Sequence, residues 1–82
     1  MKKKAIKRGD VVKYVGRSTL VGKNVGVVLK IDEIDGRSIL VEWTKPSTSM
    51  HGGGGQGKMS HCWWVDMQEI KLLPELDQIL AL

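Results

Sequence analysis

Apolar and polar residues alternate in short runs along most of this chain of 82 residues, a pattern typical of half-buried β-strands. The predicted strands cover residues 11–15, 25–34, 38–43, 61–65 and 70–72. Asp35-Gly36, between the second and third runs, predicts a hairpin turn because glycine tolerates the positive φ of a primed turn. Residues 66–69 predict a tight turn with one turn of 3₁₀ helix. The pattern therefore predicts an all-β domain with five strands.

The same alternation assigns side chains to the two faces of each strand, because successive residues point to opposite sides. Trp63 and Trp64 are adjacent, so only one of them can point inward. Because Trp63 shares a face with Val65, we expect Trp63 inside and Trp64 outside. The other side chains predicted to face the core are Val12, Tyr14, Ile39, Val41 and Trp43. In the second strand the predicted apolar face consists of Val25, Val27, Leu29 and Ile31, opposite Gly26, Val28 and Lys30.

Three segments fall outside this strand pattern. Residues 1–8 are too polar to pack and are predicted to form a basic flexible arm before the domain of residues 9–73. Residues 44–60 contain four consecutive glycines and predict a long flexible loop, of the kind that is commonly functional. Residues 74–82 have a proline at their start and predict a short helix. That helix either covers an open end of the domain or offers an apolar stripe to a partner.

The length of the chain allows one domain with a small core. A sheet that closes on itself has no exposed edges, so we expect a small closed barrel. No run approaches the roughly 18 apolar residues of a membrane span, and the first residues lack the apolar stretch of a secretion signal. We therefore expect no membrane partner. The single cysteine, Cys62, is typical of a protein of the reducing cytoplasm.

Charge is distributed unevenly along the chain. Residues 1–30 contain nine Lys/Arg and one acid, for a net +8, whereas residues 31–82 contain four Lys/Arg and eight acids, for a net −4. Such asymmetry predicts a basic surface that meets an anionic partner, or else a solvated charge run without one. The basic candidates for binding are Lys7, Arg8, Lys13, Arg17, Lys23 and Lys30.

Two short segments resemble known families. Gly9-Asp10-x-Val12 followed by Val25-Gly26-x-Val28 resembles the KOW motif of ribosomal and transcription-elongation proteins, over roughly residues 7–31. With five strands, a long loop after the third and a tight turn before the fifth, the chain is similar to SH3-like barrels. The resemblance implies a single small SH3-like five-stranded barrel whose first hairpin and loop contact RNA, DNA or a protein.

The glycine-rich loop with His51, followed by His61-Cys62-Trp63-Trp64-Val65, resembles small uncharacterised bacteriophage proteins. This resemblance implies a phage accessory protein that acts on a host component. An exposed Trp64 offers a surface on which a base can stack or a peptide can pack, unless the C-terminal tail covers it. The glycine run would let His51 and Lys58 reach a partner.

Catalytic and cofactor chemistry is not expected. The run Gly52-Gly53-Gly54-Gly55 lacks the Lys-Ser/Thr that follows a phosphate-binding loop. His51, His61 and Cys62 lack a Cys-x-x-Cys pair and a fourth ligand for a metal ion. A nucleophilic cysteine would also need an oriented base beside it. We therefore expect no enzyme, no cofactor and no small-molecule substrate.

These observations predict a non-enzymatic binding module. In the leading interpretation it binds DNA or RNA, with the basic N-terminal third on phosphates and Trp64 stacked on a base. In the alternative it is a protein–protein interaction module that binds or inhibits a host protein through the first loop, the glycine-rich loop and Trp64.

Overall fold

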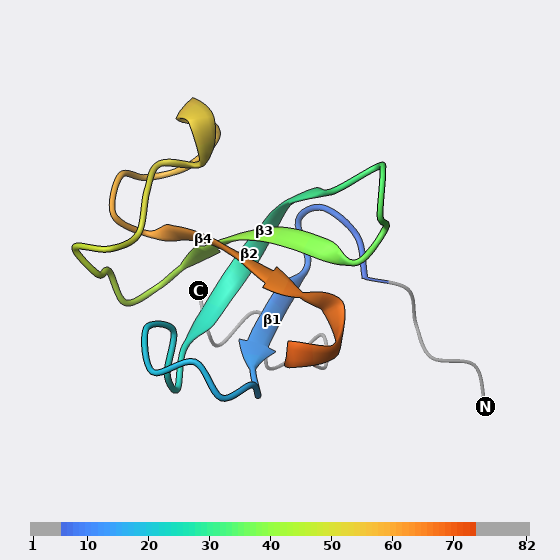
Figure 1. The fold of residues 1–82 in the computed structure, drawn as a ribbon, viewed down its shortest axis with the longest axis horizontal. Helices are drawn as coiled ribbons and strands as arrows, with labels where there is room; N and C mark the ends of the chain where they lie inside the picture. Colours follow the sequence, from blue (N-terminus) through green and yellow to red (C-terminus); the bar gives the residue numbers. More distant parts are fainter. Residues whose placement is uncertain (1–5, 74–82) are drawn as a thin grey trace.

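The computed structural model describes residues 6–73 and arranges them as five antiparallel strands in one sheet (Figure 1). The strands are β1 (Val11–Tyr14), β2 (Val25–Ile31), β3 (Ser38–Trp43), β4 (Cys62–Asp66) and β5 (Ile70–Leu72), with 3₁₀ turns η1 (Gly53–Gly55) and η2 (Met67–Glu69). The predicted all-β class is confirmed. Among the described residues there is no helix long and apolar enough to cross a bilayer. The predicted helix in residues 74–82 and the first five residues of the predicted arm lie outside the described range.

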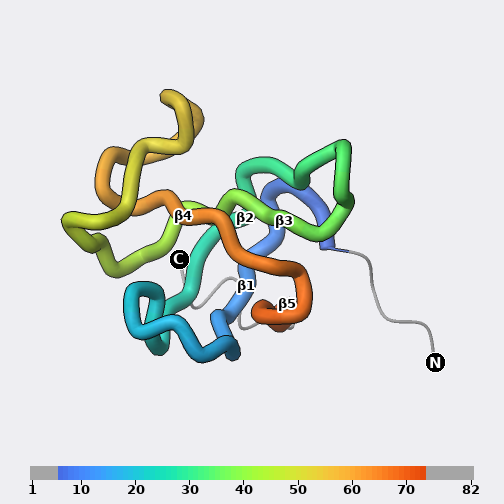
Figure 2. Tube along the Cα trace, in the orientation of Figure 1, coloured from blue at the N-terminus to red at the C-terminus, as the bar shows by residue number. Residues whose placement is uncertain are grey.

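The sheet does not close into a barrel, so that expectation was wrong. The strand order is β4-β3-β2-β1-β5, and within residues 6–73 no ladder joins the outer strands β4 and β5. The connection between them is η2, which begins with a capping box at Asp66. The Asp66 side chain accepts the N–H of Gln68 at 2.9 Å, and the Glu69 side chain accepts the N–H of Asp66 at 3.0 Å. This turn carries the chain from β4 at one edge of the sheet to β5, which pairs with β1 and forms the other edge (Figure 2).

Most strand limits agree with the alternation. β3 and β5 have the predicted bounds, and β4 is shifted by one residue. β2 ends earlier than predicted because Asp32 accepts the N–H groups of Ile34 at 2.7 Å and Asp35 at 3.3 Å, which starts a turn. The hairpin around Asp35-Gly36 forms, but its turn extends over residues 32–37.

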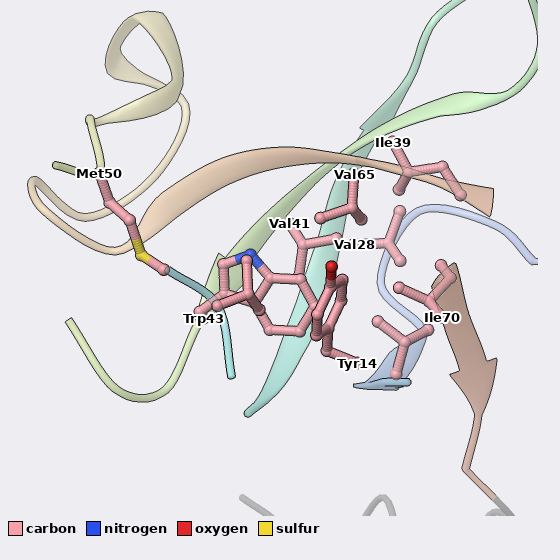
Figure 3. Close-up of a cluster of buried hydrophobic side chains, with 10 residues drawn as sticks. Tyr14, Val28, Ile39, Val41, Trp43, Met50, Val65 and Ile70 are labelled. Atoms are coloured by element: carbon pink, nitrogen blue, oxygen red, sulfur yellow. The ribbon is translucent and has the colours of Figure 1, made fainter. Parts of the chain in front are cut away.

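The core lies on one face of the sheet and contains the side chains predicted for it on β1, β3 and β4 (Figure 3). Trp43 is fully buried, and its ring meets that of Tyr14 edge to face at 5.9 Å. Gly26 lies opposite Trp43 in the β2–β3 ladder. A Cβ atom at this position would lie 2.5 Å from Val41 Cγ1 and 2.9 Å from Trp43 Cε3. The glycine therefore lets the large indole pack directly on the backbone of β2.

The apolar face predicted for β2 meets the core only at Ile31, because a β-bulge changes the alternation within the strand. The register of the β2–β3 ladder shifts between Val28 and Lys30. Before the shift, Val28 faces the core with Gly26, so Val27 lies on the opposite face. After the shift, Ile31 lies opposite Ile39 and packs against the core. A strict period of two cannot describe a strand with one extra residue.

The glycine-rich connection between β3 and β4 is folded against the sheet. Met50 packs into the core, and His51 forms a two-hydrogen-bond bridge with Cys62 (3.0 and 2.8 Å). Gly53-Gly54-Gly55 then have φ values of 64°, 66° and 90°, which only glycine adopts readily. The end of the loop then passes so close to β2 and β4 that a Cβ on Gly57 would lie 2.5 Å from Cys62 Sγ and 2.7 Å from Leu29 Cδ1.

Candidate nucleic-acid interface

The loop between β1 and β2 is anchored at its start by Tyr14. The Tyr14 hydroxyl accepts the N–H of Ser18 and donates to Glu69 Oε2, both at 2.9 Å. Burial, followed by the neighbouring Glu69 carboxylate, raises the pKa of Tyr14 despite the opposing hydrogen bond from Ser18. Gly16 passes directly over this hydroxyl, where a Cβ would collide with it. The hydroxyl therefore ties the first loop to the segment that precedes β5.

The other end of this loop is anchored by Asn24, which is buried. Its Oδ1 accepts the N–H groups of Val25 at 3.0 Å and Lys45 at 3.1 Å, and its Nδ2 donates to the Lys45 carbonyl at 3.1 Å. These bonds bring the chain after β3 beside the first loop. Lys45 Nζ consequently donates to the Lys23 carbonyl at 3.4 Å.

The anchored loop encloses a groove of about 690 Å³ between the end of β1 and the start of β2. We call it the first-loop groove; it is lined by residues 13–19 and 22–25. Lys13, Arg17 and Lys23, three of the residues predicted for binding, all contribute to its lining and are exposed. Loop folding therefore brings together three cations separated by up to ten positions in sequence.

Two further cations lie beside the groove and were missed by the sequence analysis. Lys45 is held next to Lys23 by the Asn24 hydrogen bonds. Lys71 lies opposite Lys13 in the β1–β5 ladder, so both side chains point to the same face. The alternation within β5 already predicts that Lys71 points away from the face of its apolar neighbours Ile70 and Leu72. It does not show which strand pairs with β5, so the position of Lys71 beside Lys13 could not be predicted. The role of Asn24 as a loop anchor was also missed; its position directly before a predicted strand was the sequence signal that could have indicated it.

Charge around the groove is little compensated. Within residues 6–73 the structure contains one salt bridge, Arg37–Asp66 at 3.2 Å, and none at the groove cations. The Glu69 carboxylate at the loop anchor accepts hydrogen bonds from Tyr14 and from the Asp66 backbone; it keeps its negative charge but, in this described range, forms no ion pair with the groove cations. A cluster of cations without acidic partners attracts anions such as phosphate.

Trp64 and Lys30 belong to a second surface. In the ladders, Trp64 of β4 lies opposite Leu40 of β3, which lies opposite Lys30 of β2. Residues opposite one another share a face, so the three form a row on the face away from the core. We call it the Trp64 row. Trp64 is 39% exposed and Lys30 is exposed, whereas Leu40 is buried, with Gly53 against it. The prediction that Trp63 points inward and Trp64 outward is confirmed.

Lys7 and Arg8 lie at the opposite end of the sheet from the first-loop groove. Lys7 forms a turn with Asp10, whose side chain accepts its N–H at 2.9 Å, and Gly9 donates to the Val28 carbonyl at 2.8 Å. Both cations are exposed. The structure therefore divides the predicted basic set between two ends of the sheet.

His51 and Lys58 lie on the glycine-rich loop. The His51 ring accepts the N–H of Gly53 through Nδ1 at 2.9 Å and lies 5.8 Å from the ring of Trp63. These contacts hold the glycine-rich loop in place, so His51 has a structural role. The Lys58 backbone N–H donates to Glu42 Oε2 at 3.3 Å, and Lys58 is exposed to solvent.

Cys62 is fully buried under the same loop. Burial, and then the nearby Glu42 carboxylate, raises the pKa of its thiol. A raised pKa reduces the thiolate fraction at neutral pH, and the Sγ atom donates to the Lys58 carbonyl at 3.6 Å. In the part of the chain that the structure describes, no three His, Cys, Asp or Glu side chains are grouped so that they could hold a metal ion.

Comparison with protein-family models, curated proteins and solved structures finds no match to this chain.

Proposed function

We propose that this chain is a non-enzymatic nucleic-acid-binding module whose first-loop groove contacts the phosphate backbone. The observation that carries the proposal is the convergence of Lys13, Arg17 and Lys23 on one groove, without acidic partners in the described residues. Lys45 and Lys71 extend the basic surface to either side. The strand order and the 3₁₀ turn before β5 support the SH3-like interpretation of the fold.

The groove predicts how binding depends on salt. If its five cations each contact one phosphate, the slope of log affinity against log salt is roughly −4.5 for a duplex and roughly −3.5 for a single strand. Raising salt from 50 to 200 mM then weakens single-strand binding by about 100-fold. Fluorescence anisotropy with labelled DNA and RNA, single- and double-stranded, measures this slope directly.

Matched double variants locate the contact. Replacing Arg17 and Lys23 with alanine should make the slope shallower by roughly 1.4–1.8, because two phosphate contacts are lost. Replacing Lys7 and Arg8 removes the same charge from the opposite end of the sheet and should leave the slope nearly unchanged. Equal effects of the two pairs would show that net charge acts without a defined site. Absence of binding at 50 mM salt would overturn the proposal.

A protein partner is the second candidate, supported by exposed apolar side chains at loop tips. Ile34, in the β2–β3 turn, is 97% exposed, and Met59, in the glycine-rich loop, is 73% exposed. Exposed apolar side chains mark a protein-binding surface when they form a contiguous patch, so the double variant below tests whether these two act together. If nucleic acid does not bind, affinity capture with wild-type protein against an Ile34→Ser and Met59→Ser variant tests this candidate. As a phage accessory protein the chain would act in the host cytoplasm, where a single thiol stays reduced.

A further inference from the structure

We propose that the nucleic acid is recognised as a single strand, with one unpaired base stacked on Trp64. This inference rests on the proposed function and deepens it, because it names the form of the ligand. Trp64 projects from an outer strand of the sheet and is 39% exposed, although indole rings are usually well buried. A base within a duplex keeps both π-faces covered by its neighbours, so a projecting indole can stack only on a base that is unpaired or extruded.

The neighbours of Trp64 fit a nucleotide. Lys30 lies in the same row two strands away, about 10 Å across the sheet at the usual strand spacing. Its exposed ammonium has no ion-pair partner in the described residues and is free for a phosphate next to the stacked base. Leu40, between them, is buried under Gly53 of the glycine-rich loop, so Trp64 and Lys30 are the two members of the row that a ligand can reach. The row therefore offers an aromatic surface and a cation at separate points, as single-strand binding surfaces do.

Acidic groups near the row are engaged elsewhere. Asp66 shares the outer side of β4 with Trp64, and its carboxylate forms the salt bridge to Arg37 at 3.2 Å. Glu42 shares the same side of β3 with Leu40, is half-buried and accepts the Lys58 N–H. The Arg37 cation offsets the charge of Asp66, whereas Glu42 keeps its negative charge beside the row.

Equilibrium binding of matched ligands tests the inference: a labelled single-stranded oligonucleotide of about 12 nucleotides, within the site sizes of small single-strand modules, and the duplex of the same sequence. We expect the single strand to bind more tightly than the duplex at equal salt. Trp64→Ala should weaken single-strand binding by about 5- to 150-fold, the range for loss of one stacked base, while Trp64→Phe should retain most of the affinity. Ile34→Ala, which truncates another exposed apolar side chain, should have no effect.

The salt dependence separates a contact of Trp64 from a general loss of structure. Trp64→Ala should leave the salt slope unchanged, because stacking releases no counterions, whereas Lys30→Ala should make it shallower by roughly 0.7. Equal binding of both forms of the ligand, or unchanged single-strand affinity in Trp64→Ala with the groove effects intact, overturns this inference and leaves the proposed function standing. Binding to neither form overturns both.

Discussion

Replacing Tyr14 with phenylalanine removes one oxygen atom that holds the first-loop groove to the rest of the sheet. In the wild type this oxygen accepts the Ser18 N–H and donates to Glu69 Oε2, each at 2.9 Å. The aromatic ring stays, so the edge-to-face contact with Trp43 is conserved. The substitution therefore isolates the hydroxyl from the packing of the ring.

The expected cost follows from the two hydrogen bonds. A hydrogen bond between neutral groups contributes about 0.5–1.5 kcal/mol to stability, and one to a charged group about 1.5–3 kcal/mol. Because Ser18 and Glu69 are only partly buried and can bind water in the variant, we expect a loss of about 2 kcal/mol at pH 7. A domain of this length has a total stability of roughly 4–12 kcal/mol, so the loss is measurable without abolishing the fold.

The hydroxyl also gives the wild type a pH dependence of known sign. Its pKa is raised in the folded state by burial and then by Glu69. The folded protein thus holds the proton more tightly than the unfolded chain, and the resulting stabilisation is present below about pH 10 and lost as the pH rises beyond it. The variant lacks this group, so its stability should fall less between pH 9 and pH 11.

Urea unfolding followed by tryptophan fluorescence measures both effects. With a slope near 1 kcal/mol per molar urea for a small domain, the midpoint should fall by about 2 M at pH 7. Nucleic-acid affinity should fall as well, although no charge changes, because the loop that carries Arg17 loses an anchor. An unchanged midpoint together with an unchanged alkaline transition would refute the role given to this hydroxyl.

Two further predictions concern buried positions. Gly26→Ala places a Cβ 2.5 Å from Val41 Cγ1 and 2.6 Å from the Glu42 carbonyl oxygen, so it should lower the free energy of unfolding by about 3 kcal/mol or more. The control Gly36→Ala, at φ 64° in open space, should lower it by about 1 kcal/mol. A larger loss of stability for Gly36→Ala than for Gly26→Ala in urea unfolding would contradict this packing. Cys62 is fully buried with a raised thiol pKa, so a thiol-specific reagent should modify it slowly in native buffer and rapidly in urea, whereas equal rates would show that the glycine-rich loop leaves it open.

Local alternation predicted the strands well because half-buried strands have a period of two wherever one face packs on a core. It placed Trp63 and Trp64 on the correct faces and gave β3 and β5 their correct bounds. It failed in β2, where an extra residue at the bulge moves the alternation between faces. It also could not show that Gly53 covers Leu40, which lies on the face opposite Ile39 and Val41.

Closure of the sheet could not be predicted from the strand pattern. Whether β4 and β5 meet depends on the twist of the sheet and on the path of η2, and both are properties of the assembled strands. The path of the glycine-rich loop is likewise set by non-local contacts, namely Met50 in the core and the bridge between His51 and Cys62.

The amino-acid sequence by itself determined the all-β class, the number of strands, the inward and outward tryptophans and the excess of positive charge in the first thirty residues, because each depends on local periodicity or on composition. Only the tertiary structure decided which of those charges lie together. Lys13, Arg17 and Lys23 line one groove with Lys45 and Lys71 beside it, while Lys7 and Arg8 lie at the other end. Strand pairing and the Asn24 anchor produce that grouping, and both join residues that are distant in the chain.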